Sequence, residues 1–191
     1  AETMRSMLPL LIGASPLERE RLWYRLQPLD LPLAPQAQSI IDIALWDLLA
    51  KHAKLPLYQV LGGPRSKIMS YASTPLLPSP AAYVDFVAEM IELGFKAVKF
   101  HCYCEYDLDM PMVRAVHKRY GDSGIRFMLD VEQRYSREQA LKAAQELEEL
   151  GYTWFEAPLP DFDIEGYREL KRRVKVPILG NGNWILDARL I

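Results

Sequence analysis

The chain has 191 residues, of which half are hydrophobic and a quarter are charged. Its 23 basic and 25 acidic side chains give a formal net charge of −2. This composition is typical of a globular domain and excludes disordered and collagen-like chains. The near-neutral charge gives no basis for a nucleic-acid partner, and no apolar run reaches the ~18 residues of a membrane span. Because the N-terminus also lacks the basic-then-apolar order of a signal peptide, we expect a cytoplasmic protein with no membrane partner.

Helices are the predicted structure of residues 1–65, which we assign to a first domain. One helix is predicted near Pro16–Leu26, where a proline suits the first turn. A stronger helix is predicted from Gln36 to about Lys54. It is apolar nearly all round, which predicts burial on several sides.

A second domain, residues 66–191, alternates short apolar runs with amphipathic segments. The predicted strands are Ile68–Ala72, Ala97–His101, Phe127–Val131, Thr153–Glu156 and Pro177–Leu179. The predicted helices between them are Ala81–Leu93, Met110–Tyr120, Arg137–Leu150 and Ile164–Val174. This alternation predicts an α/β fold with a parallel sheet, either an open doubly wound sheet or part of a (β/α)8 barrel. The absence of a G-x-G-x-x-G motif after the first strand lowers the case for a dinucleotide-binding domain.

Ionisable side chains follow three successive predicted strands. Lys99 and His101 share one face of the second strand, and Asp130 and Glu132 end the third, because alternate residues of a strand point the same way. Glu156 ends the fourth strand. Functional sites of parallel α/β folds gather at these carboxyl ends, and oxygen ligands on separate strands suit Mg²⁺. The alternative for any single one of these residues is a solvated loop residue or an ion-pair partner.

The two cysteines, Cys102 and Cys104, lie one residue apart. A disulfide scaffold needs a small, cysteine-rich chain, and a zinc site needs a second pair of ligands. The pair is therefore predicted to have a structural or incidental role rather than a metal-binding one.

Several motifs in their order along the chain resemble the mandelate racemase/muconate lactonizing enzyme family of the enolase superfamily. The motifs are Ser39–Leu48, Leu55–Gly63, Val98–His101, Leu129–Glu132, Trp154–Leu159 and Val176–Ile178. The resemblance covers residues from about 5 to 187. It implies a capping domain followed by a TIM-type barrel, of which about five of the eight strands are present.

The resemblance also implies a reaction and the residues that carry it. In this superfamily a Lys or His base removes a proton while Mg²⁺ stabilises the enediolate. Asp130 and Glu156 match the first two metal ligands, and Lys99 matches a lysine used as the base or as a charge that orients the substrate carboxylate. His101 is the second residue of that motif and is also expected to be catalytic. Glu132 flanks a metal ligand and is expected to bind substrate.

The third metal ligand of the family is a carboxylate after the fifth strand, and its place falls on Gly182. An amide oxygen is a neutral ligand that Mg²⁺ accepts. Asn181 or Asn183 can supply such an oxygen, and we expect Asn183 as the remaining metal ligand and Asn181 as a substrate-binding residue. The loss of one negative charge predicts a weaker metal site.

These observations predict a Mg²⁺-dependent lyase or isomerase that acts on a small hydroxy acid, most simply an acid-sugar dehydratase, in a homo-oligomer. The alternative is a non-catalytic relative that binds small acids. A Schiff-base lyase using Lys99 alone is disfavoured, because neighbouring carboxylates keep the amine charged. A closed barrel takes about 250 residues, so the chain is expected to be a piece of a larger enzyme or a truncated relative.

Overall fold

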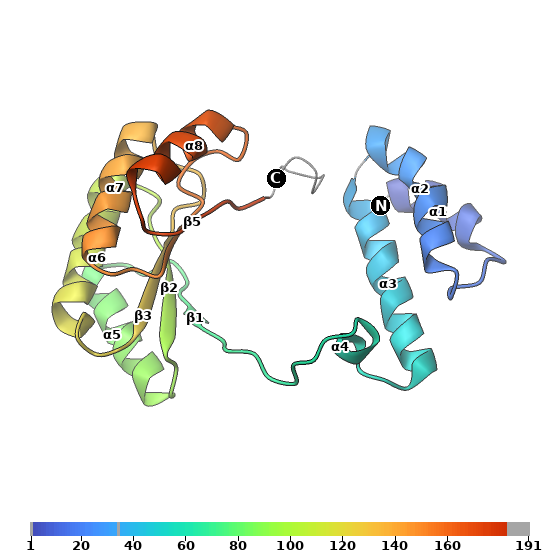
Figure 1. Cartoon of the computed structure of the whole chain (residues 1–191), viewed down its shortest axis with the longest axis horizontal. Helices are drawn as coiled ribbons and strands as arrows, with labels where there is room; N and C mark the ends of the chain where they lie inside the picture. The colour runs from blue at the N-terminus through green and yellow to red at the C-terminus, as the bar shows by residue number, and fades with distance from the viewer. Residues whose placement is uncertain (1, 34, 183–191) are drawn as a thin grey trace. The chain divides into compact units, whose positions relative to one another are not determined.

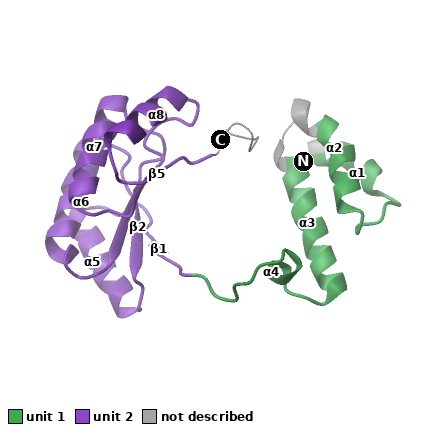
Figure 2. Cartoon of the chain, in the orientation of Figure 1, with its two compact units in different colours: residues 1–68 green, residues 69–191 purple. Residues whose placement is uncertain are grey.

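The chain forms two compact units, Ala1–Ile68 and Met69–Ile191 (Figure 2). The computed structural model describes residues 2–33 and 35–182. The first unit is helical, and the second combines a parallel sheet with helices. No helix within those described ranges is long and apolar enough to cross a membrane.

Four helices make the first unit (Figure 1). They are α1 (Glu2–Leu11), α2 (Arg19–Leu33), α3 (Pro35–Ala53) and α4 (Leu57–Val60). The helix α1, which contains Pro9, was not among the individual helices predicted for this unit. It also placed the start of α2 too early, because Pro16 lies in the turn before that helix rather than in its first turn.

The long helix α3 agrees with the predicted segment to within one residue at each end. Its side chains Ile41 and Leu45 are buried against α1 and α2, whereas Ile40 and Ile43 are 51% and 66% exposed. The prediction of burial on several sides is therefore wrong for this unit, where one face of α3 packs. The acidic residue in the middle of the helix, Asp42, forms an ion pair with Arg19 at 3.0 Å.

The second unit is built on a five-stranded parallel sheet in the order β1-β2-β3-β4-β5. The strands are β1 (Ala72–Ser73), β2 (Ala97–His101), β3 (Arg126–Asp130), β4 (Trp154–Glu156) and β5 (Ile178–Leu179). The helices between them are α5 (Pro80–Glu92), α6 (Tyr106–Tyr120), α7 (Arg137–Glu149) and α8 (Ile164–Arg173). The predicted α/β class and partial barrel are confirmed.

Two boundaries in this unit differ from the prediction by four residues, whereas several others differ by one. The first strand begins at Ala72 rather than Ile68, because Ile68 and Met69 are exposed and the sheet pairing begins where Ala72 meets Val98. Helix α6 begins at Tyr106, one turn before the predicted start. Pro111 lies inside this helix, although a proline more often marks a first turn.

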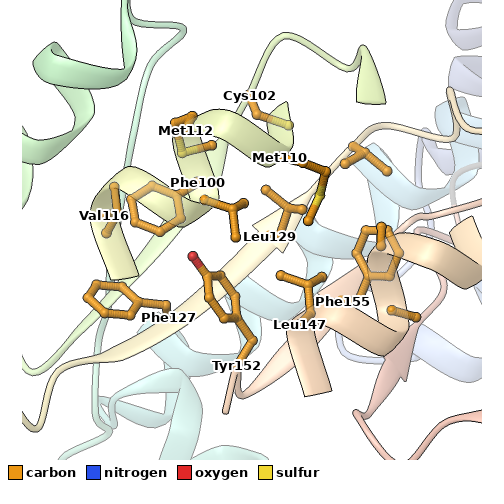
Figure 3. Packing of buried hydrophobic residues seen from close by; sticks show 14 of the residues in the cluster. Phe100, Cys102, Met110, Met112, Val116, Phe127, Leu129, Leu147, Tyr152 and Phe155 are labelled. Atoms are coloured by element: carbon orange, nitrogen blue, oxygen red, sulfur yellow. The ribbon is translucent and has the colours of Figure 1, made fainter. Parts of the chain in front are cut away.

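The core of the second unit lies between the sheet and its helices (Figure 3). Phe100, Leu129 and Phe155 occupy neighbouring strands and are fully buried there. Figure 1 shows helices α5 to α7 along the same side of the sheet. Since strand side chains alternate, residues next to these three in sequence project from the opposite face. That face carries the ionisable side chains of β2, β3 and β4.

A capping box and two glycines set where helices that cover the sheet begin and end. Ser136 and Gln139 form a reciprocal capping box at the start of α7, with hydrogen bonds of 3.2 and 3.0 Å. Gly94 and Gly151 follow α5 and α7 at φ values of +87° and +71°, a left-handed conformation that glycine adopts without strain. Each glycine turns the chain directly into the next strand and so sets where that strand begins.

Candidate active site

The carboxyl ends of three central strands are level with one another. His101 pairs in register with Asp130, and Asp130 pairs with Glu156. Parallel strands that end at the same level present their last side chains at one edge of the sheet. The register therefore brings ionisable residues far apart in sequence into one cluster.

Lys99 is the centre of this cluster. Its Nζ donates to Asp130 Oδ2 and to Glu156 Oε1, at 2.9 Å in each case. The side chains of Lys99, Asp130 and Glu156 are only 11%, 7% and 15% exposed. Burial by itself would lower the pKa of Lys99, but the hydrogen bonds to Glu156 and Asp130 outweigh it and hold the pKa above its ordinary value. In this arrangement the lysine is an ammonium ion that bridges two carboxylates.

The second oxygens of both carboxylates are also bonded. Trp154 Nε1 donates to Glu156 Oε2 at 3.0 Å, and the backbone N–H of Glu132 donates to Asp130 Oδ1 at 3.2 Å. Trp154 was not among the residues predicted for the site. Its signal was its place two residues before Glu156, on the same face of the strand. These bonds fix the orientation of both carboxylates toward Lys99.

His101 lies beside the lysine cluster and is oriented by carboxylates. Its Nε2 is 3.1 Å from Glu132 Oε1 and 3.6 Å from Asp130 Oδ2. Its backbone is held by Thr74, whose hydroxyl accepts from the His101 N–H and donates to its carbonyl, and by Tyr83. The imidazole side chain is 35% exposed, so a small molecule at the strand ends can reach it.

Tight turns follow the strand ends. Glu132 and Ala157 have positive φ values of +47°, which non-glycine residues adopt at a cost of about 1 kcal/mol or more. The N–H of Gln133 donates to the carbonyl of Ala157 at 2.7 Å and so ties the two turns together. Such strain is common at functional sites, where it aims side chains that regular backbone would point elsewhere.

The described residues after β5, 180–182, contain no carboxylate side chain. Gly182 has a φ of +72°, and its N–H donates to the buried Asp161 Oδ1 at 3.2 Å. Asn181 is partly buried beside it, and the predicted ligand Asn183 lies outside the described residues. Among residues 2–33 and 35–182, no three His, Cys, Asp or Glu side chains converge as a metal site. Of the three predicted metal ligands, the strand-end cluster therefore contains two, the carboxylates of Asp130 and Glu156.

The two carboxylates can nevertheless be compared with the ligands that commonly bind Mg²⁺ in proteins. Asp130 and Glu156 each place one oxygen 2.9 Å from the same cationic atom, so the pair already converges on one point. Mg²⁺ is commonly bound by one or two carboxylates and keeps several waters. The two residues fit a hard divalent cation, with one protein charge fewer than a three-carboxylate site.

An open hollow of about 500 Å³ adjoins the cluster. Its lining includes His101, Cys102, Cys104, Glu132 and Arg134. Charges of both signs line it, which suits a small polar acid better than an apolar ligand.

A parallel βα sheet with ionisable residues at its strand ends is the arrangement found in (β/α)8-barrel folds. Residues 82–185 match the family model "Enolase C-terminal domain-like", and residues 1–62 match the N-terminal domain of mandelate racemase/muconate lactonizing enzyme. The chain belongs to the mandelate racemase/muconate lactonizing enzyme family, and the resemblance noted in its sequence is confirmed.

Known relatives agree with this assignment. The chain is 35% identical over 151 residues to L-talarate/galactarate dehydratase of Salmonella typhimurium, covering 76% of this chain and 37% of the relative. A Pseudovibrio sp. structure assigned to the same family is 43% identical with a TM-score of 0.92, covering 98% of this chain and 50% of that one. D-glucarate dehydratase of Agrobacterium tumefaciens, solved with magnesium, is 29% identical with a TM-score of 0.80, covering 87% and 48%. The chain spans about half the length of the curated relatives it matches.

Proposed function

We propose that the intact protein containing this chain is a Mg²⁺-dependent lyase or isomerase that removes the proton α to the carboxylate of a hydroxy acid. More narrowly, we propose an acid-sugar dehydratase. The observation that carries the proposal is the convergence of Lys99, Asp130 and Glu156 at one strand-end edge. Matched relatives include a dipeptide epimerase, an acid-sugar dehydratase and a lactone cycloisomerase, which supports the reaction class more strongly than the substrate.

The chemistry explains why these residue types belong together. A proton next to a carboxylate is weakly acidic, because its removal places a second negative charge on the carboxylate group. A divalent cation held by Asp130 and Glu156 supplies Lewis-acid stabilisation of that charge. The residues around the carboxylates then have to bind the substrate and accept the proton.

Lys99 and His101 are the proposed proton-handling residues. They share a face of β2, and both contact Asp130, so a substrate carboxylate bound near that residue lies within reach of both. In the proposal, the lysine orients the substrate carboxylate as an ammonium ion, or takes the substrate proton after it has lost one of its own, and Glu132 orients the imidazole of His101. Glu132 and Asn181 are proposed to contact substrate hydroxyl groups.

Turnover by variants tests this proposal. The intact protein is incubated with Mg²⁺ and galactarate, L-talarate or arabinonate, and the keto-acid product of dehydration is measured. Lys99→Ala and Asp130→Asn are each expected to abolish product formation, whereas Lys142→Ala, on the exposed face of α7, leaves it unchanged. Full activity in either of the first two variants overturns the assignment.

The second candidate is a non-catalytic module that binds small acids, and Gly182 is the observation that favours it. A missing third carboxylate weakens the attraction for a divalent cation. Calorimetric titration with Mg²⁺ separates the candidates. Micromolar binding supports the enzyme, and the absence of binding at millimolar concentrations supports the binding module.

The remaining parts of the proposal concern the intact protein. We assign residues 1–65 to a cap and residues 66–191 to part of the barrel. We also propose a homo-oligomer in the cytoplasm that acts on small acids. Sedimentation of the intact protein tests the assembly, since a monomer at micromolar concentration contradicts it.

A further inference from the structure

The hollow beside the strand-end cluster begins at a residue of the proposed reaction. His101 Nε2 lies 3.6 Å from Asp130 Oδ2, and the same imidazole also lines the hollow. A substrate whose reacting carbon lies beside His101 therefore has room to extend its other end into this space. The volume of the hollow, about 500 Å³, is within the range of small-ligand sites.

The charged side chains that line the hollow differ in whether a protein group already pairs with them. Glu132 faces His101, with 3.1 Å between its Oε1 and the imidazole Nε2. Arg134 is exposed and forms no ion pair with any residue in the ranges 2–33 and 35–182. It is also the only arginine or lysine among the described residues of the lining. Because a guanidinium presents a fork of N–H donors that matches a carboxylate, an unpaired arginine at this place favours an anionic ligand group.

The backbone on both sides of Arg134 is fixed. The N–H of Gln133 donates to the carbonyl of Ala157 at 2.7 Å. On the other side, the hydroxyl of Tyr135 donates to the buried Asp109 Oδ2 at 2.8 Å. The arginine side chain therefore extends from an anchored part of the loop between β3 and α7, and this anchoring keeps the guanidinium at the hollow.

The loop between β2 and α6 adds an acidic side chain, the exposed Glu105, to the same lining. This loop is anchored to the same buried carboxylate, because Asp109 Oδ1 accepts from the N–H of Tyr103 at 2.8 Å. A glutamate repels a carboxylate but accepts hydrogen bonds from hydroxyl groups. The lining as a whole therefore suits a ligand that has an anionic end and hydroxyl groups along its length.

We propose that Arg134 binds the distal carboxylate of the substrate, so that the protein selects polyhydroxy dicarboxylic acids over monocarboxylic acids of the same length. The inference rests on the proposed function, which places the reacting end of the substrate beside Asp130 and His101. Arg134 is thus a specificity-determining residue and takes no part in the proton transfer.

Galactarate and galactonate are a matched pair of probes, because they differ only at the far end of the chain, where galactarate has a carboxylate and galactonate a hydroxymethyl group. The dissociation constants of both acids are measured by ligand-observed NMR with the intact protein and Mg²⁺, and the loss of each acid is followed in the same samples. We expect galactarate to bind about tenfold more tightly, since its second carboxylate gains charge-assisted hydrogen bonds. Added salt is expected to reduce this difference.

Three variants test whether Arg134 is the source of the preference. Arg134→Gln is expected to abolish the difference between the two acids, whereas Arg134→Lys is expected to retain part of it, because the charge remains without the fork of donors. The matched control is Arg168→Gln on α8, which breaks an exposed pair with Glu165 and is expected to leave the preference unchanged. Because Arg134 is exposed, its replacement is not expected to unfold the chain.

The results separate this inference from the proposed reaction. A preference for galactarate that Arg134→Gln abolishes supports the inference even if neither acid is converted, and only the proposed reaction is then overturned. Equal binding of the two acids overturns the inference even if both are dehydrated. It is also overturned if the preference persists in Arg134→Gln, if Arg168→Gln abolishes it equally, or if galactarate does not bind at millimolar concentrations.

Discussion

Replacing Lys99 with methionine tests the electrostatic account of the site. Methionine is similar in length but carries no charge, so the substitution removes the ammonium and leaves the packing close to unchanged. Asp130 and Glu156 then face each other without the cation that now lies 2.9 Å from each. Removing one partner from a buried ion pair is strongly destabilising, because the remaining charge stays buried without compensation.

The burial of the cluster sets the size of the effect. The carboxylate side chains are only 7% and 15% exposed, so water can solvate them only slightly after the substitution. Loss of a partner in such a place costs about 3–5 kcal/mol. We expect the lower value, about 3 kcal/mol, because Trp154 and the Glu132 N–H still donate to the carboxylates.

Amide hydrogen exchange in β3 reports the opening of the second unit without a contribution from the first. A loss of 3 kcal/mol corresponds to exchange about 150 times faster in the Lys99→Met variant. The matched control is Lys142→Met, which breaks an exposed pair with Glu138 and is expected to leave exchange in β3 unchanged. Exchange in β3 that is as slow in the Lys99→Met variant as in the wild-type chain would refute the argument.

Three further outcomes follow from the structure. Ser136→Ala removes the capping box with Gln139 and is expected to lower the unfolding free energy by about 1 kcal/mol in a urea titration; no change would contradict the cap. Phe155→Ala opens a cavity in the core and is expected to cost about 3–5 kcal/mol, whereas a loss below 1 kcal/mol would mean that the core is looser than described. Burial raises the pKa of Asp109 above 3.8 despite its hydrogen bond from Tyr135, so the wild-type chain loses stability as the pH rises from there through the folded value. The Asp109→Asn variant has no carboxyl group to titrate at this position. The unfolding free energy that it loses relative to the wild-type chain, measured with urea, is therefore expected to become smaller over the same pH range. A loss that does not change with pH would contradict the assignment.

Regular amphipathic patterns made most of the second unit predictable. Helix α5 has its apolar residues at helical spacing and a closing glycine, and the strand β2 was placed with its full length. The strand β1 was misplaced because an apolar run does not by itself make a strand. Ile68 and Met69 remain exposed, and the strand forms only where Ala72 finds a pairing partner.

The members of the candidate site were predictable, but their contacts were not. Because side chains alternate along a strand, the sequence places Lys99, Asp130 and Glu156 on one face of the sheet. The expected parallel pairing of the strands then places their carboxyl ends at one edge. The double ion pair of Lys99 depends on side-chain rotamers that a sequence pattern does not specify. The bond from Trp154 to Glu156 was missed for the same reason. The buried hydrogen bond from Tyr135 to Asp109 joins the loop before α7 to the start of α6, and no local sequence pattern predicts it.

Exchange of the α proton of an acid sugar with solvent is the most direct test of the proposed chemistry. The intact protein is incubated in D₂O with Mg²⁺ and galactarate, and deuterium at the α carbon is followed by NMR. We expect incorporation by the wild-type protein, and its loss on chelation of the metal or in the Glu156→Gln variant. Incorporation that persists unchanged in Glu156→Gln would contradict the claim that this strand-end cluster performs proton abstraction, as would its complete absence from the wild-type protein with every acid sugar tested.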